Sequence, residues 1–162
     1  MLQYFGEKIG KSAVRTSACS YNSRMQEVVH INKNGVTYAL LFPRSLTVQN
    51  GIQFVTKDED PLQVGIFERN TDYEVPPHRH LPRTFDLPHI AEFLSIESGT
   101  VRMKVFDEYW GIVDERTVVA GNCIVFLRGG HALSILEPAR IMEVKQGPYP
   151  GKEMDKVLRD AP

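Results

Sequence analysis

The sequence predicts an all-β fold, either an antiparallel sandwich or a closed barrel, and three observations lead to this prediction. Short segments rich in Val, Ile, Phe, Tyr and Thr follow one another, with turn signals at intervals of about 8–12 residues. Turn-forming pairs such as Asn34-Gly35, Gly121-Asn122 and Gly129-Gly130 separate them. Helical periodicity is scarce. The expected strands are residues 27–31, 36–42, 52–56, 62–68, 91–96, 101–106, 116–120, 123–127, 132–136 and 140–145.

The chain of 162 residues fits one domain, because domains most often contain roughly 100–150 residues. Residues 1–25 are polar and irregular, and we expect an N-terminal arm that packs on the barrel or on a second subunit. Residues 26–147 form the predicted barrel domain. Residues 148–162 form a short C-terminal tail, and its one helical pattern covers residues 152–159. We expect a homodimer, because closed twofold dimers are the commonest soluble oligomers.

The charge balance excludes some classes of partner. The 19 Lys and Arg residues nearly balance the 20 Asp and Glu residues, so the chain has no general attraction to nucleic acid or to anionic membranes. The first residues hold no apolar core of a signal peptide, and no apolar run reaches the roughly 18 residues that span a bilayer. We therefore expect a cytoplasmic protein that binds neither nucleic acid nor membranes.

The residues that suggest chemistry are His78, His80, Glu92 and His131. Side chains alternate between the two faces of a strand, so His78 and His80 would project to the same side and could hold one ion together. Glu92 would come from the next strand, and His131 from a strand that begins after a double-glycine turn. Taken singly, each has a simpler interpretation: a solvated histidine pair, a surface carboxylate or a turn histidine.

This pattern is similar to the two sequence motifs of the cupin superfamily, and the resemblance covers about residues 60–147. It implies a single-domain cupin-type antiparallel β-barrel, also called a jelly roll or double-stranded β-helix. In the first motif the resemblance assigns three metal ligands, and in the second motif it assigns the fourth. The ligands are His78, His80, Glu92 and His131, and the matching turn glycines are Gly99, Gly121 and Gly129. The chain departs from the family by inserting residues 81–91 before Glu92, which we expect to bulge out of the barrel.

Three imidazoles and one carboxylate form a donor set of borderline softness. Such a set suits one divalent transition metal, namely Fe, Mn, Ni, Cu or Zn, and suits Ca or Mg poorly. Four protein ligands leave two positions of an octahedral ion open to substrate, water or dioxygen. His89, within the insertion, is an alternative ligand or a second-sphere acid or base.

The ligand would be a small polar molecule, with Arg83, His89 and Tyr109 as candidate substrate-binding residues. The pattern assigns no catalytic residue. The leading hypothesis is a metal-dependent cupin acting as a dioxygenase-like oxidoreductase or an isomerase. Two alternatives stay open: a non-catalytic module that binds or senses a small molecule or a sugar, and a metal-free sugar-nucleotide epimerase or isomerase that uses a His base and a Tyr acid.

Overall fold

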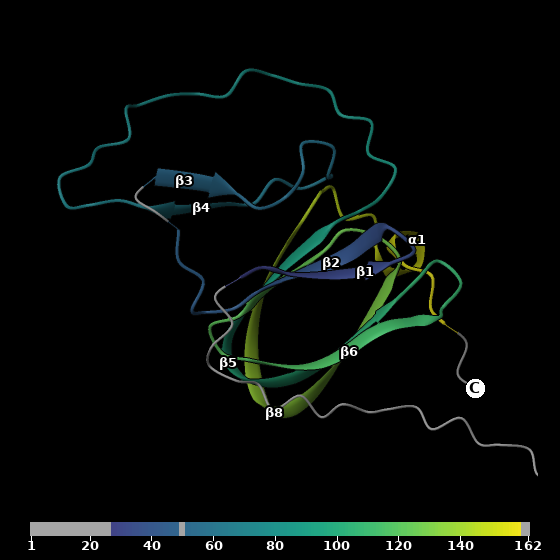
Figure 1. Cartoon of the computed structure of the whole chain (residues 1–162). Coiled ribbons are helices and arrows are strands. Elements are labelled where there is room, and N and C mark those ends of the chain that lie inside the picture. The colour runs from purple at the N-terminus through teal and green to yellow at the C-terminus, as the bar shows by residue number, and fades with distance from the viewer. Residues whose placement is uncertain (1–26, 49–50, 160–162) are drawn as a thin grey trace, which may run out of the picture.

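The computed structural model describes residues 27–48 and 51–159, which fold into an all-β structure (Figure 1). This confirms the predicted class; the predicted arm at residues 1–25 lies outside the described residues. No helix in the described part of the chain is long and apolar enough to cross a membrane. The elements are β1 (Val29–Lys33), β2 (Val36–Phe42), β3 (Gly51–Phe54), β4 (Gly65–Glu68), β5 (Glu92–Phe106), β6 (Ile112–Val119), β7 (Cys123–Phe126), β8 (Gly130–Lys145) and α1 (Lys152–Asp155).

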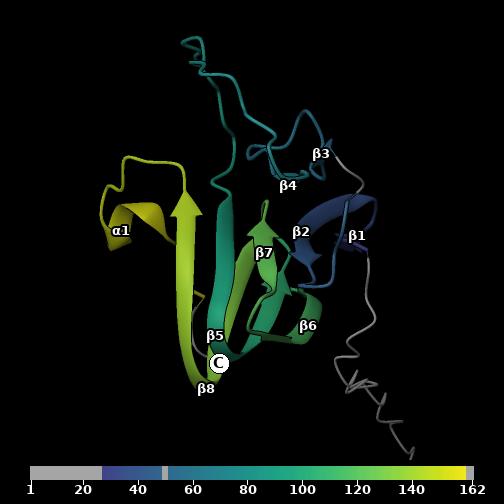
Figure 2. The ribbon, with the colours of Figure 1, turned by 90° about the vertical axis from the view of Figure 1, so that its left-hand side faces the viewer.

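Six of the strands form one antiparallel sheet. Its strand order is β1-β2-β7-β5-β6, and β8 pairs with β5. The first residues of β5 pair with β7 and its second half pairs with β6, while β8 follows β5 almost throughout. β3 and β4 form a separate two-stranded sheet. The large sheet is strongly curled and forms a half-barrel (Figures 1 and 2).

The curl of β5 and β8 brings the two ends of β5 close together. Thirteen residues separate Glu92 from Val105, which pairs with His131 of β8. In a flat strand that distance would be about 43 Å, at about 3.3 Å per residue. In the folded chain, however, the side chains of Glu92 and His131 approach to 3.1 Å. The bend in these two strands therefore assembles the concave face.

The sequence predicts strand breaks at Ser98-Gly99 and Glu137-Pro138, and these two predictions are wrong. β5 and β8 run through both positions, with shifts of register between Ile96 and Val101. The reason is that Gly99 has a φ of +82°, which bends the backbone without ending the strand. By contrast, the turn at Asn34-Gly35 joins two strands as predicted, with positive φ at both residues.

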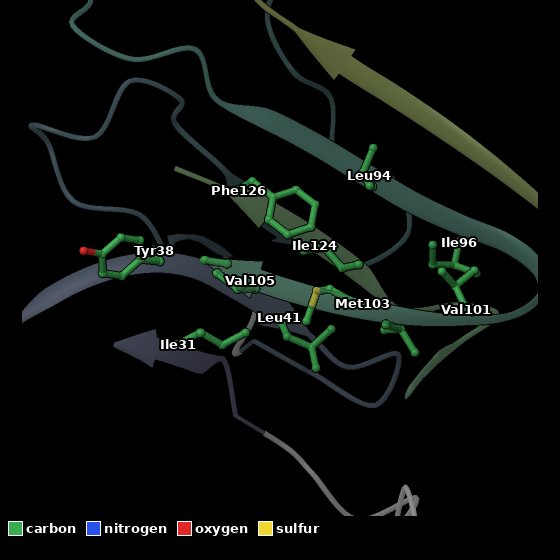
Figure 3. Packing of buried hydrophobic residues seen from close by; sticks show 12 residues of the cluster. Ile31, Tyr38, Leu41, Leu94, Ile96, Val101, Met103, Val105, Ile124 and Phe126 are labelled. Carbon is green, nitrogen blue, oxygen red and sulfur yellow. The ribbon is translucent and has the colours of Figure 1, made fainter. Parts of the chain in front are cut away.

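Two hydrophobic cores hold the sheet, one on each face. The inner core fills the concave side of the half-barrel, and its members include Leu41, Leu94, Met103, Val105 and Ile124 (Figure 3). The outer core joins β2 and β7 to the β3–β4 hairpin, and consists of Leu40, Phe42, Val125 and Leu127 with partly buried partners that include Val55, Val64, Ile66 and Phe93. The hairpin thus covers the convex side of the sheet.

Residues 69–91 form the longest connection of the described chain, and they project away from the curled sheet (Figures 1 and 2). The predicted loop after His80 is present, but the prediction that His78 and His80 share a strand is wrong. Neither residue belongs to a strand. Four prolines lie within residues 76–88, and each removes a backbone N–H that a β-ladder would need.

Candidate functional site

A carboxylate and an imidazole meet on the concave face of the half-barrel. Glu92 begins β5 and is only 7% exposed, and its Oε2 lies 3.1 Å from Nε2 of His131 in β8. The His131 ring stacks on Phe126 with a centroid distance of 4.0 Å and an interplanar angle of 7°. The turn before His131 needs glycine, because Gly129 has a φ of +68° and its added Cβ would lie 2.3 Å from the Phe106 carbonyl oxygen.

The carboxylate of Glu92 is stabilised in its charged form. The hydrogen bond from His131 lowers the pKa of Glu92, and it does so against the opposing effect of burial. The positive charges of Lys156 and Lys145 lower this pKa further, and the Nζ of Lys145 lies 3.7 Å from Glu92 Oε1. Glu92 is therefore a buried anion held between two nitrogen donors.

Lys145 connects this pair to the C-terminal segment. Its Nζ donates to Asp155 of α1 at 2.8 Å and lies 3.6 Å from Glu143 Oε1. The bond to Asp155 raises the pKa of Lys145, and the ammonium also lies 4.7 Å from the centre of the Tyr149 ring. The helix α1 is shorter than the predicted 152–159. It ends at Asp155, the residue whose carboxylate accepts the hydrogen bond from Lys145.

A pocket of about 360 Å³ lies beside the Glu92–His131 pair. Its volume falls in the range of about 300–1,000 Å³ that small-molecule sites occupy. Polar side chains of β5 and β8 line it together with apolar residues, and Lys156 from the C-terminal segment adds a positive charge. The lining residues are Glu92, Leu94, His131, Ala132, Leu133, Ile141, Glu143 and Lys156.

The other two predicted metal ligands lie on the projecting loop. The rings of His78 and His80 are neighbours, with centroids 5.4 Å apart. Nδ1 of His78 lies 2.9 Å from the Pro76 carbonyl oxygen. Since a carbonyl only accepts, Nδ1 is the donor there, and the neutral form of this ring would have its lone pair on Nε2.

The candidate substrate-binding residues lie in two different loops of the fold. Arg83 and His89 are exposed on the loop of residues 69–91. Tyr109 is 91% exposed in the turn between β5 and β6, where Asp107 Oδ1 accepts its backbone N–H at 3.0 Å. None of the three lines the pocket beside Glu92, so their role in binding stays a prediction.

The residues present fit a metal ion only in part. Metal–nitrogen and metal–oxygen bonds of about 2.1 Å place neighbouring donor atoms roughly 3 Å apart, and Glu92 and His131 have this separation. However, no three His, Cys, Asp or Glu residues gather closely enough to hold a metal within residues 27–48 and 51–159. The structure thus brings two of the four predicted ligands together and leaves His78 and His80 apart from them.

Sequence reasoning missed the residues that surround the pair. Lys145, Asp155 and Lys156 were not predicted to take part in a site, although one signal was present. Ile141, Glu143 and Lys145 alternate along the last strand, so a charged pair shares the inner face with an apolar residue. The part played by Asp155 and Lys156 depends on how the tail folds back, which no local pattern specifies.

Comparison with known proteins finds no match for this chain. No family model matches the chain, and no curated protein and no solved structure matches it either. The functional argument therefore depends on the residues themselves.

Proposed function

We propose that this chain is a metal-dependent protein of the cupin type that acts on a small polar molecule in the concave-face pocket. In this proposal Glu92 and His131 hold one divalent transition metal, and His78 and His80 complete the ligand set from the loop. The jelly-roll class is part of the proposal, as an extension of the half-barrel. The observation that carries it is the buried Glu92 carboxylate, 3.1 Å from the His131 imidazole beside a pocket.

The chemistry of the two histidine donors supports this assignment. A histidine that donates Nδ1–H to a backbone carbonyl presents Nε2 for coordination, and this arrangement is common among metal ligands. His78 has that hydrogen bond, and His80 lies next to it. The loop thus carries two adjacent imidazoles, and the Nδ1 of one of them is hydrogen-bonded to a backbone carbonyl as it commonly is in metal ligands.

The length of the loop permits His80 to reach the pair. Twelve residues lead from His80 to Glu92, and a chain of that length spans up to about 40 Å when extended, at about 3.3 Å per residue. The entropy of closing such a loop is about 2 kcal/mol. Apparent binding free energies of structural zinc sites reach about 10–16 kcal/mol. Metal binding would therefore exceed the entropic cost of closing the loop.

The chain's own residues define what the site does with a ligand. Lys145 holds one oxygen of Glu92, so the other oxygen stays directed at His131. Leu94, Leu133 and Ile141 supply apolar surface for the nonpolar part of a ligand. When bound, the metal would supply a Lewis acid or a site for dioxygen, which suits isomerase or dioxygenase-like oxidoreductase chemistry.

A second candidate is a metal-free binding module. The observation that favours it is the Glu92 network, in which the carboxylate already has two nitrogen partners without an ion, His131 at 3.1 Å and Lys145 at 3.7 Å. The same site without metal would also serve an epimerase or isomerase with His131 as base. The epimerase or isomerase also needs a tyrosine as general acid. We propose Tyr149, which lies beside Lys145, for this role.

Elemental analysis of untagged protein, purified without added metal, separates these proposals. We compare the wild type with His78→Ala/His80→Ala and with Glu92→Gln/His131→Ala. The control is His30→Ala, which removes an exposed imidazole of β1. About one equivalent of one metal, kept in the control and lost in both double variants, supports the four-ligand site.

The other outcomes reject part or all of the proposal. Loss of metal in the Glu92→Gln/His131→Ala variant alone would limit the site to the concave-face pair and remove the loop histidines. No metal in the wild type, even after incubation with Fe, Mn, Ni, Cu and Zn salts, would reject metal dependence. The metal-free candidates would then remain.

A further inference from the structure

The loop of residues 69–91 carries a hollow of its own, separate from the concave-face pocket. Its volume is about 430 Å³, and it is lined by Arg79, His80, Leu81, Arg83 and Phe85. None of these residues lines the pocket beside Glu92. The hollow is thus built from one short stretch of chain, with two arginines in its wall.

The two arginines have no carboxylate partner in the part of the chain that the structure describes. Arg102, Arg116 and Arg140 each pair with an Asp or Glu within 4.0 Å. Arg79 and Arg83 take part in no such pair, and no acidic residue lines their hollow. Two guanidinium groups that share a hollow without a counter-charge produce a local positive potential that favours an anion.

The ligand that fits this wall is a dianion with several acceptor oxygens. A guanidinium presents a rigid set of N–H donors that matches phosphate oxygens, and a phosphate monoester carries up to two negative charges, one for each arginine. A carboxylate brings only one.

The apolar part of the hollow indicates that the anion is attached to an organic group. Leu81 is 74% exposed and Phe85 is 67% exposed, so both present apolar surface to a ligand bound between the arginines. A flat or apolar group can pack on the Phe85 ring. Inorganic phosphate would leave that surface uncovered.

We propose that Arg79 and Arg83 form a binding site for a phosphate monoester, and that Leu81 and Phe85 contact its organic portion. This inference goes beyond the proposed function, because it needs neither a metal nor the Glu92–His131 pair. The loop would then bind a phosphorylated small molecule by itself.

The test is isothermal titration calorimetry on the full chain at low ionic strength, with phenyl phosphate, inorganic phosphate and benzoate as probes. We expect one saturable site for phenyl phosphate. Inorganic phosphate should bind less tightly because it leaves Phe85 uncovered. Benzoate should bind at least about tenfold less tightly, because it has a single charge. Affinity should fall as salt is added.

Matched variants identify the residues. Arg79→Gln/Arg83→Gln should reduce phenyl phosphate affinity at least about tenfold, whereas Arg102→Gln/Arg116→Gln, which removes the same charge from β5 and β6, should leave it within about twofold. Phe85→Ala should remove the preference for phenyl phosphate over inorganic phosphate. Arg79, Arg83, Phe85 and Arg102 are exposed and Arg116 is partly buried, so none of these side chains belongs to a hydrophobic core. A far-ultraviolet circular dichroism spectrum checks each variant.

The calorimetry would overturn the inference if it gave no saturable binding of phenyl phosphate, equal losses in the two arginine double variants, or equal affinity for benzoate. Glu92→Gln/His131→Ala and chelator-treated protein should each bind phenyl phosphate at one saturable site, because no metal then draws His80 out of the hollow. Loss of binding in that variant would place the anion at the concave-face pocket and reject the loop site. Failure of the metal proposal therefore leaves this inference intact, and the reverse also holds.

Discussion

The substitution Gly99→Ala tests whether the bend in β5 holds the candidate site together. Gly99 has a φ of +82°, and an added Cβ would lie 2.2 Å from the Pro138 carbonyl oxygen and 2.7 Å from the Ala139 Cα. Both contacts are with the backbone of β8, so they cannot be relieved by turning a side chain. Relief requires β8 to move away from β5 at the point where both strands curl.

The expected magnitude has two parts. Placing alanine at positive φ costs roughly 1–2 kcal/mol, and forcing an extra carbon into a tightly packed position adds about 1–3 kcal/mol. The matched control is Gly35→Ala. Gly35 has a similar φ of +79°, but its added Cβ would meet nothing within 4 Å. The control should therefore lose only the first part.

The assay is urea unfolding of both variants, followed by circular dichroism. We expect Gly99→Ala to lower the free energy of unfolding by about 2–5 kcal/mol and Gly35→Ala to lower it by about 1–2 kcal/mol. The difference between them measures the close approach of the two strands. If both variants lose the same free energy, β5 and β8 do not approach in this way, and the assembly of Glu92 with His131 by the bend is refuted.

Three further predictions concern charges and the core. The pKa of Glu92 lies below its ordinary value of 4.5, so the charged carboxylate stabilises the fold above that pH, and this stabilisation is lost as the pH falls through the lowered pKa. The urea midpoint of Glu92→Gln should therefore fall less on acidification than that of the wild type. The pKa of Lys145 lies above 10.5, so its stabilisation is lost as the pH rises through the raised pKa. Asp155→Asn should therefore be less sensitive to alkali than the wild type in thermal melts at high pH, and equal sensitivity would contradict the Lys145–Asp155 contact. Met103 is fully buried and Met142 is 50% exposed, so Met103→Ala should cost about 2–5 kcal/mol and Met142→Ala about 0.5 kcal/mol or less in urea unfolding.

Most of the strands could be predicted from local pattern, because alternation and turn residues act over a few positions. β2 has the predicted bounds, and the turns at Asn34-Gly35 and Gly121-Asn122 separate strands as expected. The errors at Gly99 and Pro138 have one cause. A glycine or proline in a β-rich run ends a strand in most contexts, but here the long β5–β8 ladder carries the chain through the bend.

The site could be predicted only where strand alternation places its residues. Glu92 and His131 were proposed from the motif resemblance, and they meet because Glu92 is the first residue of β5 and His131 the second residue of β8, two strands that also supply the inner core. Lys145 has the same kind of signal and was overlooked because it resembles an ordinary surface lysine. Asp155 was missed for a different reason: its partner is set by the return of the tail over the sheet, a tertiary contact without a local signature.

The two halves of the predicted ligand set differ in what positions them. Glu92 and His131 are held by a continuous ladder and two buried cores, so moving either one requires breaking strand pairs. His78 and His80 are held by a proline-rich connection whose backbone lacks ladder partners. The free energy that would draw them inward is therefore supplied by a ligand rather than by the fold. This difference explains why only two of the four predicted ligands converge in the folded chain, and why variants of the two pairs must be tested separately.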